Sequence, residues 1–195
     1  MLESLALGLA LLAAVSAFLV PTYFGRLKPG YSHLRHTISE LGETGSPISK
    51  KVSYFGFVPI GLLVMAYIGV TAQILPESTH RSIGLLGLVG VGYVGGGVFR
   101  CDAGAPQSGS ASNTLHNIFG LVEYLSAAAA FSMLRADAHF APLSSFFHYA
   151  GIAIIICLIG TSFRHPLRGL VQRIAEALIF GGIVLMAWLV FGGSA

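Results

Sequence analysis

Residues 83–99 read IGLLGLVGVGYVGGGVF, an apolar segment that contains seven glycines. Its length is close to the roughly 20 residues that cross a hydrocarbon core about 30 Å thick. Glycine at this density weakens a helix in water, but within a membrane it lets a neighbouring backbone approach closely. The segment therefore predicts a transmembrane helix at the centre of a helix bundle.

Five further apolar segments of similar length accompany it. Backbone groups inside lipid must be hydrogen-bonded within their own segment, so we expect helices rather than strands. The connections 76–82 and 165–169 are short, which makes consecutive helices antiparallel neighbours. The sequence thus predicts an all-α membrane protein, a six-transmembrane-helix antiparallel bundle that forms a single domain over residues 1–195. The expected helices span about 2–20, 52–74, 83–99, 114–134, 144–163 and 170–191.

The composition supports the membrane interpretation. Hydrophobic residues make up 54% of the 195 residues and charged residues 10%, with a mean hydropathy of +0.78, whereas soluble domains carry roughly 25% charged residues. The net charge of +3 does not indicate nucleic acid as a partner, because the basic residues form no patch with interleaved aromatics. Cys101 and Cys157 are badly placed for a disulfide and show no CxxC spacing. The first apolar segment lacks a basic leader and a cleavage site, so we expect a retained helix.

The basic residues predict the orientation. Nine of the eleven lie in or beside the first, third and fifth connections, and only Arg81 and Arg135 lie on the other side. Positively charged loops usually face the cytoplasm. We therefore expect a multi-pass protein of the cell (inner) membrane with connections 1, 3 and 5 cytoplasmic and both termini extracytoplasmic. The nine residues are Arg26, Lys28, Arg35, Lys50, Lys51, Arg100, Arg164, Arg168 and Arg173.

The first connection is about 30 residues long, and loops of such length are usually functional or contain structure of their own. Within it, Thr37–Glu40 reads TISE and fits a capping box, which predicts a short interfacial helix. The alternative interpretation turns His33, His36, Ser39 and Glu40 towards a site between the helices.

Three further residues are candidates for chemistry. Asp102 follows the third expected helix and His116 opens the fourth. Glu123 lies seven residues after His116, on the same face and about 10 Å further along the axis. An ionisable group near the bilayer midplane is a functional-site hypothesis by default; the alternative is a protonated carboxyl bonded to a neighbour such as Tyr93. The expected catalytic residues are Asp102, His116, Glu40 and Glu123.

The fifth connection supplies a group of arginines. Arg164, Arg168 and Arg173 are candidates for contacts with a headgroup phosphate. Alternatively they snorkel to the interface or hold anionic lipid headgroups, and Arg173 forms an intrahelical ion pair with Glu176, three residues further on.

Three segments taken together, RHTISELG, FRCDAGAP…TLHNIFG and GLVQRIAEA, resemble the membrane protein family known as domain of unknown function 998. The resemblance extends over nearly the whole chain in order and spacing. It implies no settled activity. Many members carry a second histidine four residues after the first, where this chain has Gly120. The polar set implied by the resemblance is Arg35, Thr37, Ser39, Glu40, Asp102, His116, Gln172 and Arg173.

Several functions fit these residues. The first is an enzyme acting on a lipid or isoprenoid headgroup at the cytoplasmic face, in which a divalent metal is held by Asp102, His116 and one of His33 or His36. The second is a transporter or channel using Glu123. The third is a non-catalytic protein that binds lipid or a partner. Haem is the least supported cofactor, because paired mid-helix histidines are missing. Expected partners are membrane lipids and, through the glycines of residues 92–96, a second copy of the chain.

Overall fold

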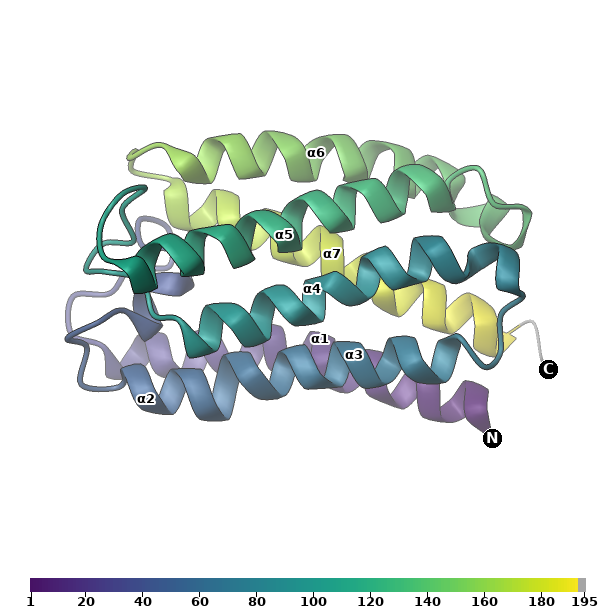
Figure 1. The fold of residues 1–195 in the computed structure, drawn as a ribbon, viewed down its shortest axis with the longest axis horizontal. Helices are drawn as coiled ribbons and strands as arrows, with labels where there is room; N and C mark the ends of the chain where they lie inside the picture. Colours follow the sequence, from purple (N-terminus) through teal and green to yellow (C-terminus); the bar gives the residue numbers. More distant parts are fainter. Residues whose placement is uncertain (193–195) are drawn as a thin grey trace.

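The computed structural model describes residues 1–192 and contains no strand within them. Six long helices lie side by side, and each is long and apolar enough to cross a membrane (Figure 1). The predicted fold class is confirmed. The spanning helices are α1 (Leu2–Leu27), α2 (Ser49–Val52) continued by the π-helical turn η2 (Ser53–Phe57) and α3 (Val58–Thr71), α4 (His80–Val98), α5 (Ala111–Leu134), α6 (Ser144–Ser162) and α7 (Arg168–Gly192).

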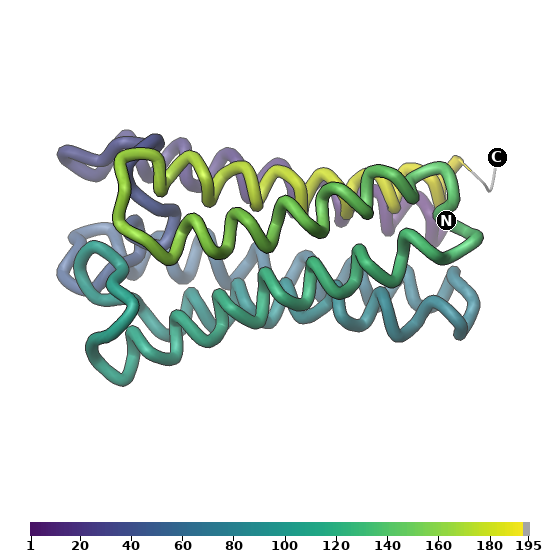
Figure 2. Tube along the Cα trace, turned by 90° about the horizontal axis from the view of Figure 1, so that it is seen from above, coloured from purple at the N-terminus to yellow at the C-terminus, as the bar shows by residue number. Residues whose placement is uncertain are grey.

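The helices form a closed ring in chain order. Each of α1, α3, α4, α5 and α6 packs against the next, and α7 returns to α1. Both termini lie at one end of the bundle (Figures 1 and 2). The opposite end carries three connections, which are residues 28–48, 99–110 and 163–167. This opposite end is named the long-loop end below.

The glycines of α4 set its distance to both neighbours. A Cβ at Gly90 would lie 2.6 Å from the carbonyl oxygen of Gly61 in α3, and a Cβ at Gly92 would lie 2.6 Å from Cβ of Glu123 in α5. These glycines are therefore used for packing within one chain. Association of two copies through Gly92 and Gly96 stays a prediction.

The helices extend beyond several of the predicted limits. The first helix was expected to end at about Val20, but α1 continues through Pro21 to Leu27. Beside the proline, the Thr22 hydroxyl donates to the carbonyl of Phe18, one turn earlier in the helix, at 2.7 Å. The helices α4, α5 and α7 begin two or three residues before their predicted starts.

An aromatic core fills the half of the bundle away from the long loops. Phe131, Phe140 and Phe147 are fully buried there, and the rings of Phe131 and Phe147 lie 5.0 Å apart between centroids. Phe180 lies deeper along α7 and meets Tyr93 edge-on, with ring centroids 5.5 Å apart. The polar cavity described below lies in the other half of the bundle.

Candidate functional site

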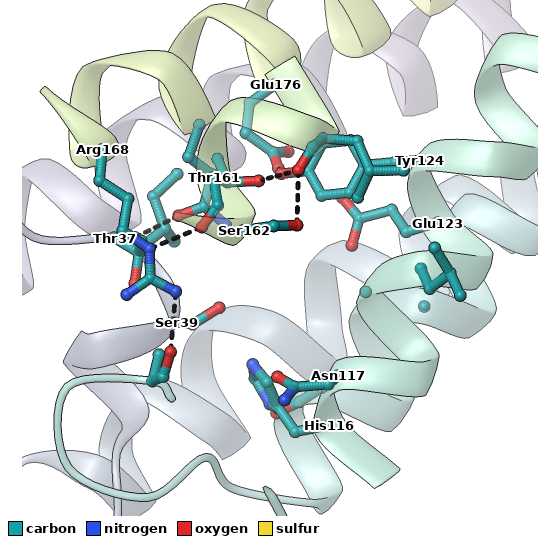
Figure 3. A pocket seen from close by; sticks show the side chains of 18 of the residues that line it. Thr37, Ser39, His116, Asn117, Glu123, Tyr124, Thr161, Ser162, Arg168 and Glu176 are labelled. Atoms are coloured by element: carbon teal, nitrogen blue, oxygen red, sulfur yellow. Dashed lines mark hydrogen bonds between the residues drawn. The ribbon is translucent and has the colours of Figure 1, made fainter. Parts of the chain in front are cut away.

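A cavity of about 320 Å³ lies at the long-loop end, between α4, α5, α6 and α7 (Figure 3). The first and third connections also reach it, through residues 37–39 and 105–107. Its size is at the lower end of the range of small-molecule pockets. The polar residues that line it are Thr37, Ser39, Tyr93, Gln107, His116, Asn117, Glu123, Tyr124, Thr161, Ser162, Arg168, Gln172 and Glu176.

Two glutamates and two tyrosines form the closed end of the cavity. The hydroxyl of Tyr93 donates to Oε2 of Glu176 at 2.5 Å, and that of Tyr124 donates to Oε1 at 2.7 Å. Glu123 is 7% exposed, its carboxyl lies within hydrogen-bonding reach of Glu176, and its Oε1 atom is buried without a hydrogen-bond partner. The alternative prediction was a hydrogen bond between the Glu123 carboxyl and Tyr93, but the Tyr93 hydroxyl donates to Glu176 instead.

The cluster lies deep within the membrane-spanning region. Glu123 is close to the middle of α5, and Glu176 is eight residues into α7. Figure 3 shows both glutamates beside Tyr124 at one side of the cavity. A buried polar atom without a partner is costly in such surroundings.

His116 lines the cavity nearer to the long-loop end. Its Nδ1 atom lies 2.8 Å from the carbonyl oxygen of Phe99 and 3.1 Å from that of Gly96. Both partners are acceptors, so Nδ1 carries a hydrogen, and in the neutral ring Nε2 is an acceptor. The main-chain carbonyls at the end of α4 therefore fix the orientation of this ring.

The three arginines have different environments. Arg168 lines the cavity, but its guanidinium donates to the carbonyls of Thr161, Gly104 and Ala105 at 2.7, 3.0 and 2.7 Å. It therefore ties the third connection to the end of α6. Arg164 is exposed and does not line the cavity.

Arg173 holds the first connection against α7. Its guanidinium donates to the carbonyls of His33 and His36 at 2.7 and 3.1 Å, to Nδ1 of His33 at 2.9 Å and to the Tyr31 hydroxyl at 2.7 Å. The predicted ion pair between Arg173 and Glu176 is wrong, because the arginine points to the loop and Glu176 accepts from tyrosines. The spacing of residues cannot predict these bonds from Arg173 to the loop, because every residue has a main-chain carbonyl, whatever its side chain.

The proposed metal ligands do not come together. Within residues 1–192 no group of three histidine, cysteine, aspartate or glutamate residues is placed to hold a metal ion. His33 bonds Arg173, His36 accepts from the amide of Ser32 at 2.8 Å, and only His116 of the four lines the cavity. The predicted metal-ligand set, which is His33, His36, Asp102 and His116, is therefore not assembled in the structure. These residues make separate local contacts.

Asp102 fixes the start of α5. Its carboxylate accepts from the amide and hydroxyl of Ser110 at 2.7 and 2.8 Å, and the Ser110 hydroxyl in turn caps the helix by accepting from the amide of Asn113 at 3.2 Å. These bonds with Ser110 lower the pKa of Asp102. Asp102 does not line the cavity, so a general acid or base there is not supported by the geometry.

The predicted capping box is present in the first connection. The amide of Thr37 donates to the Glu40 carboxylate at 2.9 Å, and the amide of Glu40 donates to the Thr37 hydroxyl at 3.3 Å. It starts a single 3₁₀ turn, η1 (Ser39–Gly42), rather than a longer interfacial helix. Glu40 is buried in this turn and does not line the cavity, whereas Ser39 does.

Burial changes the acidity of loop groups beside the site. It raises the pKa of Tyr31 to about 12 and that of Cys101 to about 12. Burial, followed by the positive charges of Arg173 and Arg26, lowers the pKa of His33. Neutral His33 is consistent with the hydrogen bond that its Nδ1 accepts from Arg173.

Several residues that line the cavity were not predicted from the sequence. Glu176, Tyr124 and Thr161 were not singled out for it, although each lies on the ring-facing side of its helix. An acidic residue eight positions into an apolar helix was a signal for Glu176, but its spacing from Arg173 favoured a local ion pair. Gln172 entered only through the resemblance, and here its Oε1 accepts from the amide of Ile38 at 2.6 Å.

The fold and the site define a class, a polytopic helix-bundle membrane protein with a deep polar cavity at one end. The family described as "Protein of unknown function (DUF998)" matches residues 11–189, and the chain belongs to this family. The resemblance seen in the sequence is thus confirmed. No curated protein and no solved structure matches the chain.

Proposed function

We propose that this chain is a proton-linked carrier, which takes a small solute into the cavity from the long-loop end. The observation that carries the proposal is Glu123, whose Oε1 atom is buried without a partner where the cavity ends. Intramembrane carboxyls that face an internal cavity are typical of proton and ion pathways.

The neighbouring carboxyl explains how a proton is held. Glu123 and Glu176 lie within reach of each other in surroundings of low dielectric. Two charged carboxylates in contact repel each other and are poorly solvated, so the pair is more stable when it shares one proton. The tyrosine hydroxyls on Glu176 favour its charged form, which leaves the proton to Glu123.

The rest of the bundle supports access from one end. The ring of helices is closed by the contact between α7 and α1. Beyond Glu123 the ring is filled by the aromatic core around Phe131 and Phe147. A polar cavity that ends at such a packed region has the form of one open state of a carrier.

The headgroup enzyme is less well supported. Its proposed phosphate contacts are separated: Arg164 is exposed, Arg168 bonds three carbonyls, and Arg173 bonds groups of the first connection. Within residues 1–192, therefore, no group of free cations faces the cavity near Glu123.

The orientation belongs to the same proposal. The long-loop end carries nine of the eleven basic residues, so we place it in the cytoplasm and both termini outside the inner membrane. The cavity would then open to the cytoplasm.

Proton flux tests the proposal. Purified protein is reconstituted in vesicles that contain a pH-sensitive dye, and potassium with valinomycin clamps the voltage. A pH gradient is imposed together with a gradient of one solute, which is an aliphatic diamine, a dicarboxylate or a sugar, because a coupled carrier moves protons only with its solute. With the solute that is carried, we expect wild-type vesicles to equilibrate at least tenfold faster than vesicles containing Glu123→Gln.

The matched control is Glu77→Gln, the same change at an exposed residue of the opposite end. It should keep the wild-type rate. Equal rates for wild type, Glu123→Gln and protein-free vesicles would refute proton-linked transport.

A further inference from the structure

The hydrogen-bonding groups around the cavity are mainly acceptors. His116 uses Nδ1 on two backbone carbonyls and presents Nε2 as an acceptor. Asn117 donates through Nδ2 to the carbonyls of Pro106 and Gln107, at 2.9 and 3.1 Å, so its oxygen is the atom left for a ligand. Figure 3 shows these two side chains together on one side of the cavity.

The hydroxyls on the opposite wall follow the same pattern. Thr161 and Ser162 each donate to the carbonyl of Leu158, at 2.9 Å in both cases. A hydroxyl that has used its hydrogen can only accept from a ligand. Glu123 adds its unpartnered Oε1 at the closed end.

Arg168, the one lysine or arginine among the described residues that line the cavity, does not reverse this balance. Arg168 directs its guanidinium at three carbonyls of the third connection and α6. An anion placed in the cavity would face the Glu123–Glu176 pair and a wall of acceptors. A ligand rich in donors and positively charged would satisfy them.

We infer that the solute is a linear aliphatic amine, whose ammonium group binds Glu123 and whose far end reaches His116 and Asn117. This inference rests on the proposed function and names its substrate class. His116 and Glu123 are seven residues apart on one helix, which is about 10 Å along the axis. An extended diamine has its donors at the two ends of such a chain, whereas an ethanolamine headgroup entering from the membrane offers only its ammonium end.

Binding is coupled to a proton. The ammonium ion at Glu123 replaces the proton on the carboxyl pair, and that proton leaves to water, so the charge at the pair is balanced. A diamine protonated at both ends brings a second positive charge, which lies at the His116 end. The titratable and charged groups that face Glu123 are Glu176 from α7, Tyr93 from α4 and its neighbour Tyr124, with His116 and Arg168 across the cavity.

Calorimetry tests this inference. Hexane-1,6-diamine is titrated into wild-type protein in phosphatidylcholine nanodiscs, in two buffers with different ionisation enthalpies. We expect saturable binding with about one proton released per diamine bound. Hexane-1,6-diol, of the same length but uncharged, should bind at least tenfold more weakly.

Three variants separate the effect of the Glu123 carboxylate from an effect on the fold. Glu123→Gln should lower the affinity for the diamine at least tenfold and abolish proton release, while Glu77→Gln behaves as wild type. Glu123→Asp keeps a carboxylate on a shorter side chain, so it should bind more weakly but still release a proton. Equal affinities for diamine and diol, or unchanged binding by Glu123→Gln, would overturn the inference.

A second arm distinguishes the two sources of the amine. In phosphatidylethanolamine nanodiscs the affinity for the diamine falls if the lipid headgroup occupies the site, and stays unchanged if the solute is a free amine. The result is also separable from the proposed function. Proton flux without amine binding would overturn only the substrate class, and amine binding without flux would overturn only transport.

Discussion

Gly92 offers a direct test of how α4 and α5 position the glutamate cluster. A Cβ added there would lie 2.6 Å from Cβ of Glu123 and 2.9 Å from the carbonyl oxygen of Phe119. Ordinary van der Waals contact starts at 3.4 Å, so Gly92→Ala must separate the two helices locally by roughly 0.8 Å. Overpacking of this kind costs about 1–3 kcal/mol.

The matched control is Gly84→Ala in the same helix, where nothing lies within 4 Å of the added Cβ. Alanine is a better helix former than glycine by about 1 kcal/mol, so this variant should be as stable as wild type or slightly more stable. The gain in helix propensity is common to both variants, so the expected difference between them is the overpacking cost of about 1–3 kcal/mol.

Unfolding by sodium dodecyl sulfate in mixed micelles, followed by circular dichroism, measures this difference. The proton flux of Gly92→Ala should also fall, because the substitution displaces the backbone of Glu123. If Gly92→Ala proved as stable as Gly84→Ala, the close approach of α4 to α5 described above would be wrong.

Three further predictions concern the loops. Arg173→Lys removes the planar guanidinium that bonds several groups of the first connection. We expect the free energy of unfolding to fall by about 2–3 kcal/mol and the first connection to be proteolysed faster. Arg164→Lys, the same change at an exposed arginine, should behave as wild type. Cys101 is fully buried and its pKa is raised to about 12. At pH 7 maleimide should therefore modify it at least 100-fold more slowly than a cysteine introduced at the exposed position 108 by Ser108→Cys, on the order of the difference in thiolate fraction and access. Comparable rates for the two cysteines would contradict the burial of Cys101. Hydrogen bonds from Ser110 lower the pKa of Asp102, so the carboxylate stabilises the fold at pH values above its ordinary pKa and loses this effect as the pH falls through the lowered pKa. The difference in melting temperature between wild type and Asp102→Asn should therefore become smaller only below about pH 4. A smaller difference already at neutral pH would refute the hydrogen bonds between Ser110 and the Asp102 carboxylate.

Part of the site could be read from the chain. Glu123 is conspicuous because an acidic residue in the middle of an apolar segment is expensive in lipid. His116 opens the same helix, and helix geometry alone puts it on the same face. Both of these residues line the cavity.

The hydrogen-bond partners of the site residues could not be predicted from the sequence. Tyr93 and Glu176 are 83 positions apart, and their hydrogen bond exists only because the ring brings α4 and α7 together. Arg173 and Asp102 were expected at a site, but they bond loop groups within their own neighbourhoods. Loop carbonyls and main-chain amides are present at every position, so no residue pattern predicts which of them a side chain will find.

The sequence by itself determined the membrane class, the six helices and the end where polar residues gather. These follow from local quantities, namely the length of apolar segments, the cost of unpaired backbone groups in lipid and the distribution of charge. The tertiary structure decided which polar residues share a cavity and which merely hold loops in place. That decision depends on the closure of α7 onto α1 and on glycine contacts of α4 with α3 and α5, which together set the unpartnered carboxyl of Glu123 beside Glu176.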